Sequence, residues 1–261
     1  MIIKKEEKKM SSIKNLEEKE KTVEKKTETE TKTEIIKSVI LDKEIKTMFK
    51  SSVHFGHFHS KKHPLMNNYI YGIRNNVDII DLLETKRLME RTLDYLKEKK
   101  KEKTLILFVG TKVSARDIIK SLAEKVKAPY VVERWLGGTL TNFEVIKKRI
   151  EHLKEMEEKK KRGELEKYTK KEKLRINQDI ERMERKLGGL RRLDRLPDLI
   201  FLVDPGQEKH AIEEARKKKI PIVSICDTDS DPTSSDYFIP ANDDSSSSLN
   251  YILKKVEKVL I

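Results

Sequence analysis

The sequence contains a single cysteine, Cys226. One cysteine excludes a framework of intramolecular disulfides and any structural zinc site built on several thiolates. The chain also lacks a run of about 18 uninterrupted apolar residues, so no transmembrane helix is expected. Aromatic residues make up only 6% of the 261 residues and hydrophobic residues only 36%, whereas 39% are charged. This shortage of apolar material indicates that part of the chain is solvated or bound to a polar partner.

One sign of charge is in excess, because 58 Lys and Arg residues stand against 45 Asp and Glu residues, which gives a net charge of +13. Such a surplus is typical of proteins that bind a polyanion such as nucleic acid. The first residues have no apolar centre like that of a secretion signal, and residues 1–38 alternate Lys with Glu, unlike an acid-poor transit peptide. We therefore expect a protein that stays where it is made, in the cytoplasm or in an organelle matrix.

The composition divides the chain into three parts. Residues 1–38 are rich in Lys and Glu and contain no aromatic residue, Gly or Pro. Such a segment cannot bury enough apolar surface to offset the entropy of ordering it, and we predict a disordered N-terminal tail. Residues 39–141 and 188–261 are expected to form an α/β core domain, and residues 142–187 a helical hairpin inserted into it.

The core domain is predicted from apolar runs that alternate with amphipathic helical patterns. Strands that are apolar on both faces require a parallel sheet covered by helices, with right-handed crossovers between the strands. The expected strands are residues 104–110, 130–132, 198–204, 220–226 and 237–239. The expected helices are residues 40–50, 84–99, 114–127, 208–218 and 246–260. The predicted fold class is therefore a doubly wound α/β domain.

The inserted segment has a different periodicity. Ile146, Ile150 and Leu153 follow a 4-then-3 spacing, and the same spacing returns within residues 176–187. This pattern is typical of the seam of a coiled coil. The pair Arg162–Gly163 interrupts it, and two glycines follow its end, where a helix C-cap uses Gly. We predict an antiparallel coiled-coil hairpin whose helices, of about 18 residues each, extend about 27 Å.

An enzyme is an alternative, because doubly wound folds bind ligands at the carboxyl ends of their strands. A phosphate-binding loop needs several spaced glycines, but Gly110–Lys112 holds only one. Asp227, Asp229 and Asp231 have the spacing of the first ligands of a calcium-binding loop. The sequence that follows lacks the Gly and the final Glu that such a loop requires, so the motif is rejected. A phosphotransferase that binds magnesium through Asp227 and Asp229 remains an alternative. The plainer interpretation is that these carboxylates cap a turn.

The histidines and the cysteine give no catalytic pattern. His54, His57, His59 and His63 lie within ten residues, but structural zinc sites prefer Cys partners and none is near. We therefore expect histidines that face solvent or RNA. Cys226 ends a strand pattern without a basic partner and is expected in the core. No cofactor, metal or small-molecule substrate is predicted.

Positive charge is concentrated in the hairpin. Residues 144–192 hold 18 Lys and Arg residues and 11 Asp and Glu residues, so a fifth of the chain carries more than half of its net charge. Repulsion disfavours such a surplus unless phosphates neutralise it. The preceding segment, Arg134–Phe143, contains the only Trp and two Gly residues. Its glycines allow close approach of the backbone to a partner. The alternative is a packed hinge in which Trp135 is buried and Thr141 or Asn142 is the helix N-cap.

Several short motifs of this sequence resemble those of the bacterial and organellar type of small-subunit ribosomal protein two. The motifs occur in the family's order over roughly residues 45–260. The ten-residue motif Arg134–Phe143 is specific by itself. The principal motifs are His54–His57, Tyr69–Gly72, Phe108–Lys112, Arg134–Phe143, Leu187–Gly189, Arg195–Asp198, Asp227–Thr228, Asp231–Pro232 and Asn242–Asp244. The sequence departs from the family pattern at Asp229 and Ser230, and at Ala241, where the family has Gly.

The resemblance implies a flavodoxin-like domain with a protruding coiled-coil hairpin. It also implies a structural constituent of the small ribosomal subunit that has no enzymatic activity and does not bind a membrane. Its implied partners are small-subunit ribosomal RNA and other small-subunit proteins, among them the large mRNA-binding one. Charge, expected exposure and the matched motifs together predict nine RNA-binding residues: Lys112, Arg116, Arg134, Lys147, Lys148, Arg149, Arg191, Arg192 and Arg195. A coiled-coil protein that binds another protein, with weak dependence on salt, is the second alternative.

Overall fold

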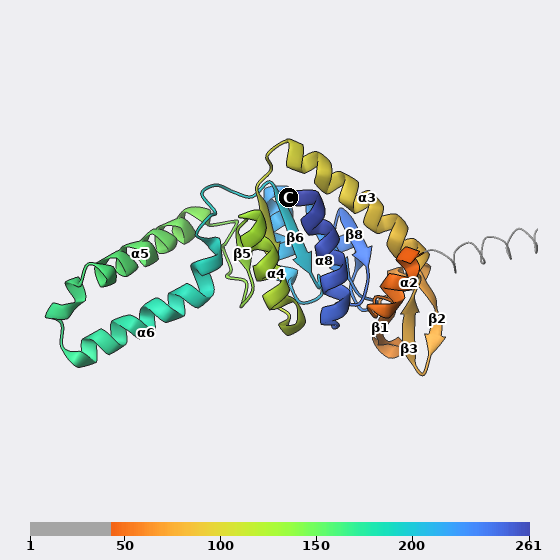
Figure 1. Cartoon of the computed structure of the whole chain (residues 1–261), viewed down its shortest axis with the longest axis horizontal. Coiled ribbons are helices and arrows are strands. Elements are labelled where there is room, and N and C mark those ends of the chain that lie inside the picture. The colour runs from red at the N-terminus through yellow and green to blue at the C-terminus, as the bar shows by residue number, and fades with distance from the viewer. Residues whose placement is uncertain (1–42) are drawn as a thin grey trace, which may run out of the picture. The chain divides into compact units, whose positions relative to one another are not determined.

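A computed structural model describes residues 43–261 of the chain (Figure 1). The chain divides into two compact units, residues 1–47 and residues 48–261. Of the first unit only residues 43–47 are described, at the start of helix α2, Lys43–Lys50. The predicted disordered tail lies outside the described residues, as do the first three residues of the helix predicted over 40–50. Among the described residues, no helix combines the length and the apolar character needed to cross a bilayer.

The second unit is built around a parallel five-stranded sheet, as the sequence predicts. Its strand order is β5-β4-β6-β7-β8. This order places the first strand of the sheet second from the edge, as in the 2-1-3-4-5 arrangement of flavodoxin-like folds. The strands are β4 Ile106–Val109, β5 Tyr130–Val131, β6 Leu199–Val203, β7 Ile222–Cys226 and β8 Tyr237–Pro240. Each lies within the predicted range except β8, which extends one residue further.

Helices cover both faces of this sheet, and this explains why β4, β6 and β7 are buried at every position. On one face, Phe108 and Phe201 stand opposite each other in register and pack under α3, α4 and α8. On the other face, Leu107 and Ile200 pack with α7 and the base of the hairpin. Full burial of each such side chain contributes about 1.5–3 kcal/mol. The helices are α3 Leu82–Lys101, α4 Val113–Val126, α7 Lys209–Lys218 and α8 Ser246–Leu260.

The segment between β5 and β6 forms two helices that lie side by side and run antiparallel (Figure 1). They are α5 Phe143–Lys161 and α6 Lys170–Leu187. The predicted break occurs at Gly163, whose φ of +73° needs the conformational freedom of glycine. α6 then begins with a capping box between Thr169 and Glu172. Of the predicted seam residues, five are buried: Ile146, Ile150, Leu153, Ile180 and Leu187.

A small antiparallel sheet, which was not predicted, has the strand order β1-β3-β2. The strands are β1 Phe55–Phe58, β2 Ile70–Arg74 and β3 Val77–Ile80. Strands β2 and β3 are joined by Asn75 and Asn76, which both have positive φ, at 51° and 61°. Two consecutive residues of this kind suit the tight hairpin turn that matches the twist of the strands. This Asn pair is the signal that reveals the hairpin, but the flanking strands are too short and irregular in register to show clear alternation.

The first of the two glycines after α6 is the helix C-cap, as predicted, and the second serves a different purpose. Gly188 adopts right-handed helical backbone angles, with a φ of −57°. Gly189 lies against β5, where a Cβ would come within 2.2 Å of the carbonyl oxygen of Tyr130. Glycine is therefore required here because two backbones approach closely, which fixes the end of the hairpin against the edge of the sheet.

We expect Gly189→Ala to lower the free energy of unfolding by about 1–3 kcal/mol, because the added methyl group forces the two backbones apart. Gly137→Ala is the matched control, since a Cβ there meets nothing within 4 Å. It should change the free energy by less than about 0.5 kcal/mol. Urea unfolding of the two purified variants measures both values. Equal stability of the two variants would contradict the close approach at Tyr130.

Candidate functional site

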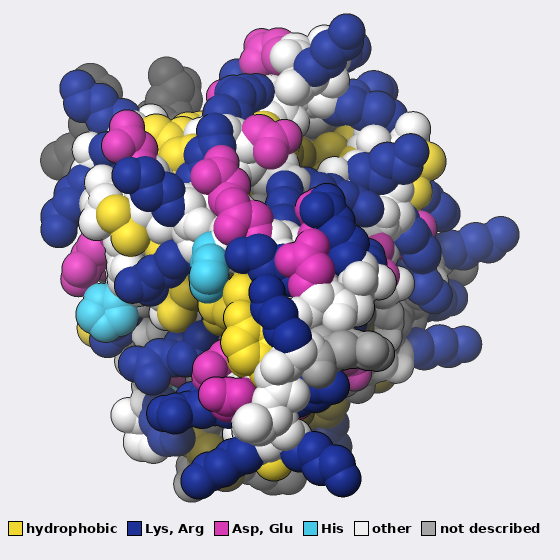
Figure 2. Space-filling view, turned by 90° about the vertical axis from the view of Figure 1, so that its left-hand side faces the viewer, with side chains coloured by type: hydrophobic (Ala, Val, Ile, Leu, Met, Phe, Trp, Pro, Cys, Tyr) yellow, Lys and Arg dark blue, Asp and Glu magenta, His cyan; other side chains and the backbone are white. Residues whose placement is uncertain are grey.

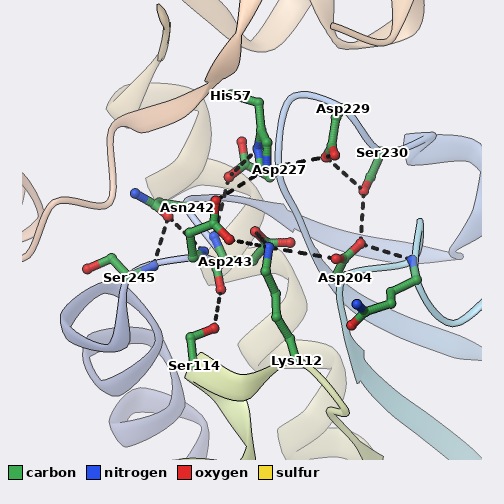
Figure 3. A network of polar contacts seen from close by, with 12 residues as sticks. His57, Lys112, Ser114, Asp204, Asp227, Asp229, Ser230, Asn242, Asp243 and Ser245 are labelled. Atoms are coloured by element: carbon green, nitrogen blue, oxygen red, sulfur yellow. Dashed lines mark hydrogen bonds and ion pairs between the residues drawn. The ribbon is translucent and has the colours of Figure 1, made fainter. Parts of the chain in front are cut away.

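A network of charged side chains lies at the carboxyl ends of the parallel strands (Figure 3). Lys112 follows β4, Asp204 follows β6, Asp227 follows β7 and Asp243 follows β8. The carboxyl ends of parallel strands meet at one edge of the sheet, and ligands of open α/β folds bind at this edge. The fold therefore brings together Lys112 and Asp243, which lie 131 positions apart in the chain.

Lys112 lies at the centre of this network rather than on the surface. Its Nζ is 2.6 Å from Asp243 Oδ1, 2.6 Å from Asp244 Oδ1 and 3.7 Å from Asp204 Oδ2. Burial by itself lowers the pKa of the amine, but these carboxylates outweigh burial and raise the pKa above its ordinary range. Lys112 is one of the nine predicted RNA-binding residues, and its ammonium group is already occupied by carboxylates of this chain.

His57 also belongs to the network, and this corrects the expectation of a solvent-facing histidine. Its Nδ1 lies 3.2 Å from Asp227 Oδ2, and its Nε2 lies 3.3 Å from Asp244 Oδ2. The hydrogen bond to Asp227 raises the pKa of His57 to about 9, against the opposing effect of burial. The His57 peptide N–H donates to Thr228 Oγ1 at 2.8 Å, which ties β1 to the end of β7. His54 is buried as well, stacked on Phe49.

The four clustered histidines do not converge on one site. His59 Nδ1 lies 2.7 Å from Asp78 Oδ1, and His63 caps a short helical turn by accepting a hydrogen bond from the Leu65 N–H. Within residues 43–261, the set that could hold a metal ion is instead His57, Asp227 and Asp243, whose ligand atoms lie within 4.8 Å of one another. One imidazole and two carboxylates suit a divalent cation such as zinc. Each of these two carboxylates already has a cationic partner in this chain, since Lys112 pairs with Asp243 and His57 pairs with Asp227.

The Asp residues after β7 have separate roles. The Asp227 carboxylate is buried and accepts a hydrogen bond from the Thr228 N–H at 2.5 Å. Asp231 caps the next turn by accepting from the Thr233 N–H at 2.9 Å, as the plainer interpretation predicts. Cys226 is fully buried in the core, also as predicted. Burial raises the pKa of its thiol, which makes it a poor nucleophile.

A second group of contacts fixes the hinge between the sheet and the hairpin. Glu214 of α7 is only 7% exposed, and its carboxylate accepts five hydrogen bonds from this hinge. The donors are Trp135 Nε1 at 3.0 Å, Gly138 N at 2.8 Å, Leu140 N at 2.9 Å, Thr141 N at 3.0 Å and Thr141 Oγ1 at 3.1 Å. Trp135 is itself 7% exposed. The hinge is therefore packed, which was one of the two alternatives left open by the sequence.

The electrostatics of Glu214 follow from these contacts. Burial alone raises the pKa of its carboxyl, but the hydrogen bonds from the hinge outweigh burial and hold the pKa below its ordinary value. Asn142 is the N-cap residue of α5, but its side chain makes no capping hydrogen bond. Glu214 was not among the predicted residues, although the sequence holds one signal for it. Its position, beside Ala215 and three residues after Ala211, places a charge on the apolar face of a helix.

The nine predicted RNA-binding residues fall into two groups. Five are exposed and form no ion pair with any described residue: Arg134, Lys147, Lys148, Arg149 and Arg192. The other four contact groups of this chain. Lys112 is held as described above, Arg116 Nε donates to the Thr111 carbonyl at 2.8 Å, and Arg195 forms a bidentate pair with Asp198 at 2.6 and 2.7 Å. Arg191 pairs with Glu157 of α5 and Glu184 of α6.

Three of the five exposed cations lie on helix α5, on the hairpin side of the molecule. Figure 2 shows this side, where Lys and Arg side chains outnumber Asp and Glu and surround scattered hydrophobic side chains. The hairpin residues Lys147, Lys148 and Arg149 follow one another on the first two turns of α5. Consecutive residues on a helix point in different directions, so the three cations cannot all reach one phosphate. The surface suits an extended polyanion better than a small anionic ligand.

We expect Glu214→Gln to lower the free energy of unfolding at pH 7 by about 2 kcal/mol, because an amide leaves some of the hinge donors unpaired. Glu213→Gln, an exposed neighbour, is the control and should change it by less than about 0.5 kcal/mol. Denaturant unfolding at several pH values measures both.

The pH dependence gives a second check. The lowered pKa means that the folded state favours the carboxylate, so its stabilising effect is complete above the ordinary pKa of 4.5 and is lost as the pH falls through the lowered value. The difference between the unchanged chain and Glu214→Gln should therefore shrink in acid. A difference that grows in acid would contradict this assignment.

Comparisons with known proteins agree with the resemblance seen in the sequence. The family described as "Ribosomal protein S2" matches residues 48–261. A curated relative from Thermus thermophilus, named small ribosomal subunit protein uS2, is 44% identical over 217 residues, which cover 83% of this chain and 85% of the relative. One with the same name from Helicobacter hepaticus is 42% identical over 217 residues, covering 83% of this chain and 82% of the relative. The match spans the sheet, the hinge and both hairpin helices, and the chain therefore belongs to the ribosomal protein S2 family.

Proposed function

We propose that this chain is a structural constituent of the small ribosomal subunit that binds ribosomal RNA and neighbouring ribosomal proteins and supports translation. Membership of the ribosomal protein S2 family carries this proposal, since the curated relatives are named as proteins of the small subunit. The protein is not an enzyme. It works in the cytoplasm as part of the subunit, and one of its neighbours there is the large mRNA-binding protein.

We further propose that residues 142–187 act as a coiled-coil insertion in a core domain made of residues 39–141 and 188–261. The antiparallel arrangement of α5 and α6 supports it, as does the burial of Ile146, Ile150 and Ile180 from both helices in one hydrophobic cluster. A hairpin held in this way presents a long charged surface at the edge of the sheet, where it reaches RNA without disturbing the core.

The RNA contacts are assigned mainly to the five exposed cations Arg134, Lys147, Lys148, Arg149 and Arg192. Arginine offers a planar fork for bidentate phosphate contacts, whereas lysine supplies a compact charge. Arg116 and Arg195 keep part of their side chains exposed and contribute beside their internal partners. Lys112 and Arg191 form internal ion pairs, and we therefore assign both a structural role. They stabilise the fold that presents the exposed cations to RNA.

Sedimentation tests the proposed function directly. In a sucrose gradient of cell lysate, the chain should migrate with small ribosomal subunits at low salt and leave them as the salt concentration rises, because phosphate contacts release counterions. A chain that stays at the top of the gradient under gentle conditions would instead favour the alternative of a coiled coil that binds another protein. The phosphotransferase alternative predicts magnesium-dependent turnover, which we expect to be absent.

A charge variant tests the hairpin assignment. We expect Lys147→Ala with Lys148→Ala to leave small subunits at a lower salt concentration than the unchanged chain, since each lost phosphate contact lowers the salt slope by about 0.7–0.9. Lys217→Ala with Lys218→Ala removes the same charge from the exposed end of α7 and serves as the control. Sedimentation over a salt series measures both. Identical release of the two variants would count against a role for α5 in RNA binding.

A further inference from the structure

A groove lies between α5 and α6 near the end of the hairpin that adjoins the sheet. Its volume is about 520 Å³, within the range of sites that bind small ligands. We call it the hairpin groove. Arg149 comes from α5, Arg182 and Lys186 come from α6, and Leu136 of the hinge closes one side.

The charge of the hairpin groove favours an anion. Arg149 and Lys186 are exposed and make no ion pair with any described residue. Arg182 is the one cation there that is already paired, with Asp179, the carboxylate that lines the same groove. Two unpaired cations from facing helices can close on a single phosphate, which carries several acceptor oxygens. The ion pairs of this part of the hairpin thus leave positive charge in the groove.

The walls of the hairpin groove distinguish a nucleotide from a bare anion. Leu187 is buried and Met183 half-buried, and together with Leu136 they give the groove an apolar side. A thioether makes favourable contacts with aromatic rings. The ring of His152 lines the same space and offers a surface on which a base can stack. An apolar side next to unpaired cations suits a group that is flat and apolar at one end and anionic at the other.

We propose that the hairpin groove binds one nucleotide of ribosomal RNA from a single-stranded or looped segment, with its phosphate between Arg149 and Lys186 and its base against Met183 and His152. This inference rests on the proposed function and makes it specific to one site. An acidic peptide from a neighbouring protein offers carboxylates for the cations. It is less suited to the groove, because it offers no flat apolar ring for the opposite wall.

The experiment uses the full chain and small subunits prepared without it. The test variant is Arg149→Ala with Lys186→Ala. The control is Lys154→Ala with Arg175→Ala, which removes one Lys and one Arg from exposed positions of the same two helices outside the groove. Rebinding to the subunits is measured over a salt series, and thermal unfolding confirms that all three chains are folded. Ultraviolet crosslinking of the bound chain, followed by peptide mapping, identifies what lies in the groove.

We expect the test variant to bind more weakly than the control, with a salt slope lower by about one to two, as for the loss of one or two phosphate contacts. Crosslinked nucleotides should map to the peptides that contain His152 and Met183. Equal effects of the two variants would overturn the proposal, since they would show only general attraction. A crosslink from these peptides to protein instead of RNA would also overturn it, while leaving the proposed function intact. Failure of the unchanged chain to rebind would overturn both.

Discussion

The buried carboxylate of Glu214 decides where the hairpin leaves the sheet. Three backbone N–H groups, one indole N–H and one hydroxyl group of the hinge donate to it, and without it these donors would be buried beside an apolar core. The hinge carries Arg134 on its exposed side and Leu136 against the groove between the helices. The position of the basic surface relative to the sheet therefore depends in part on one acidic side chain of α7.

The same residue types serve two physical purposes in this protein. Lys112 and Arg191 neutralise carboxylates at places where strands or helices meet, and a charge removed there would leave its partner without compensation. Lys147 and Lys148 face water and have no partner in the described chain. For them, a positive surplus costs stability through repulsion until a polyanion neutralises it. Internal charges thus stabilise the fold, whereas the exposed charges remain available to a partner of opposite sign.

Much of the fold could be predicted because its signals are local. Continuous apolar runs indicated the strands of the parallel sheet, and helical periodicity indicated α5 and α6 close to their observed ends. The small sheet escaped because β1 and β3 have only four residues each. The pairing of Arg191 with Glu157 spans 34 residues and exists only once the hairpin has folded back on itself. Sequence composition locates positive charge, but only tertiary structure separates the cations that are free from those already paired.

The order of the chain gives the Glu214 contacts a consequence for biosynthesis. Residue 214 is translated after the whole hairpin, so the hinge leaves the ribosome more than 70 residues before the carboxylate that organises it. Until then its amide groups bond to water, and the contact between Gly189 and Tyr130 holds only the other end of the hairpin. Since domains form as the chain emerges, the nascent hairpin completes its docking only after α7 has been synthesised. A chain interrupted between the two would carry a basic hairpin whose hinge is not yet fixed by Glu214.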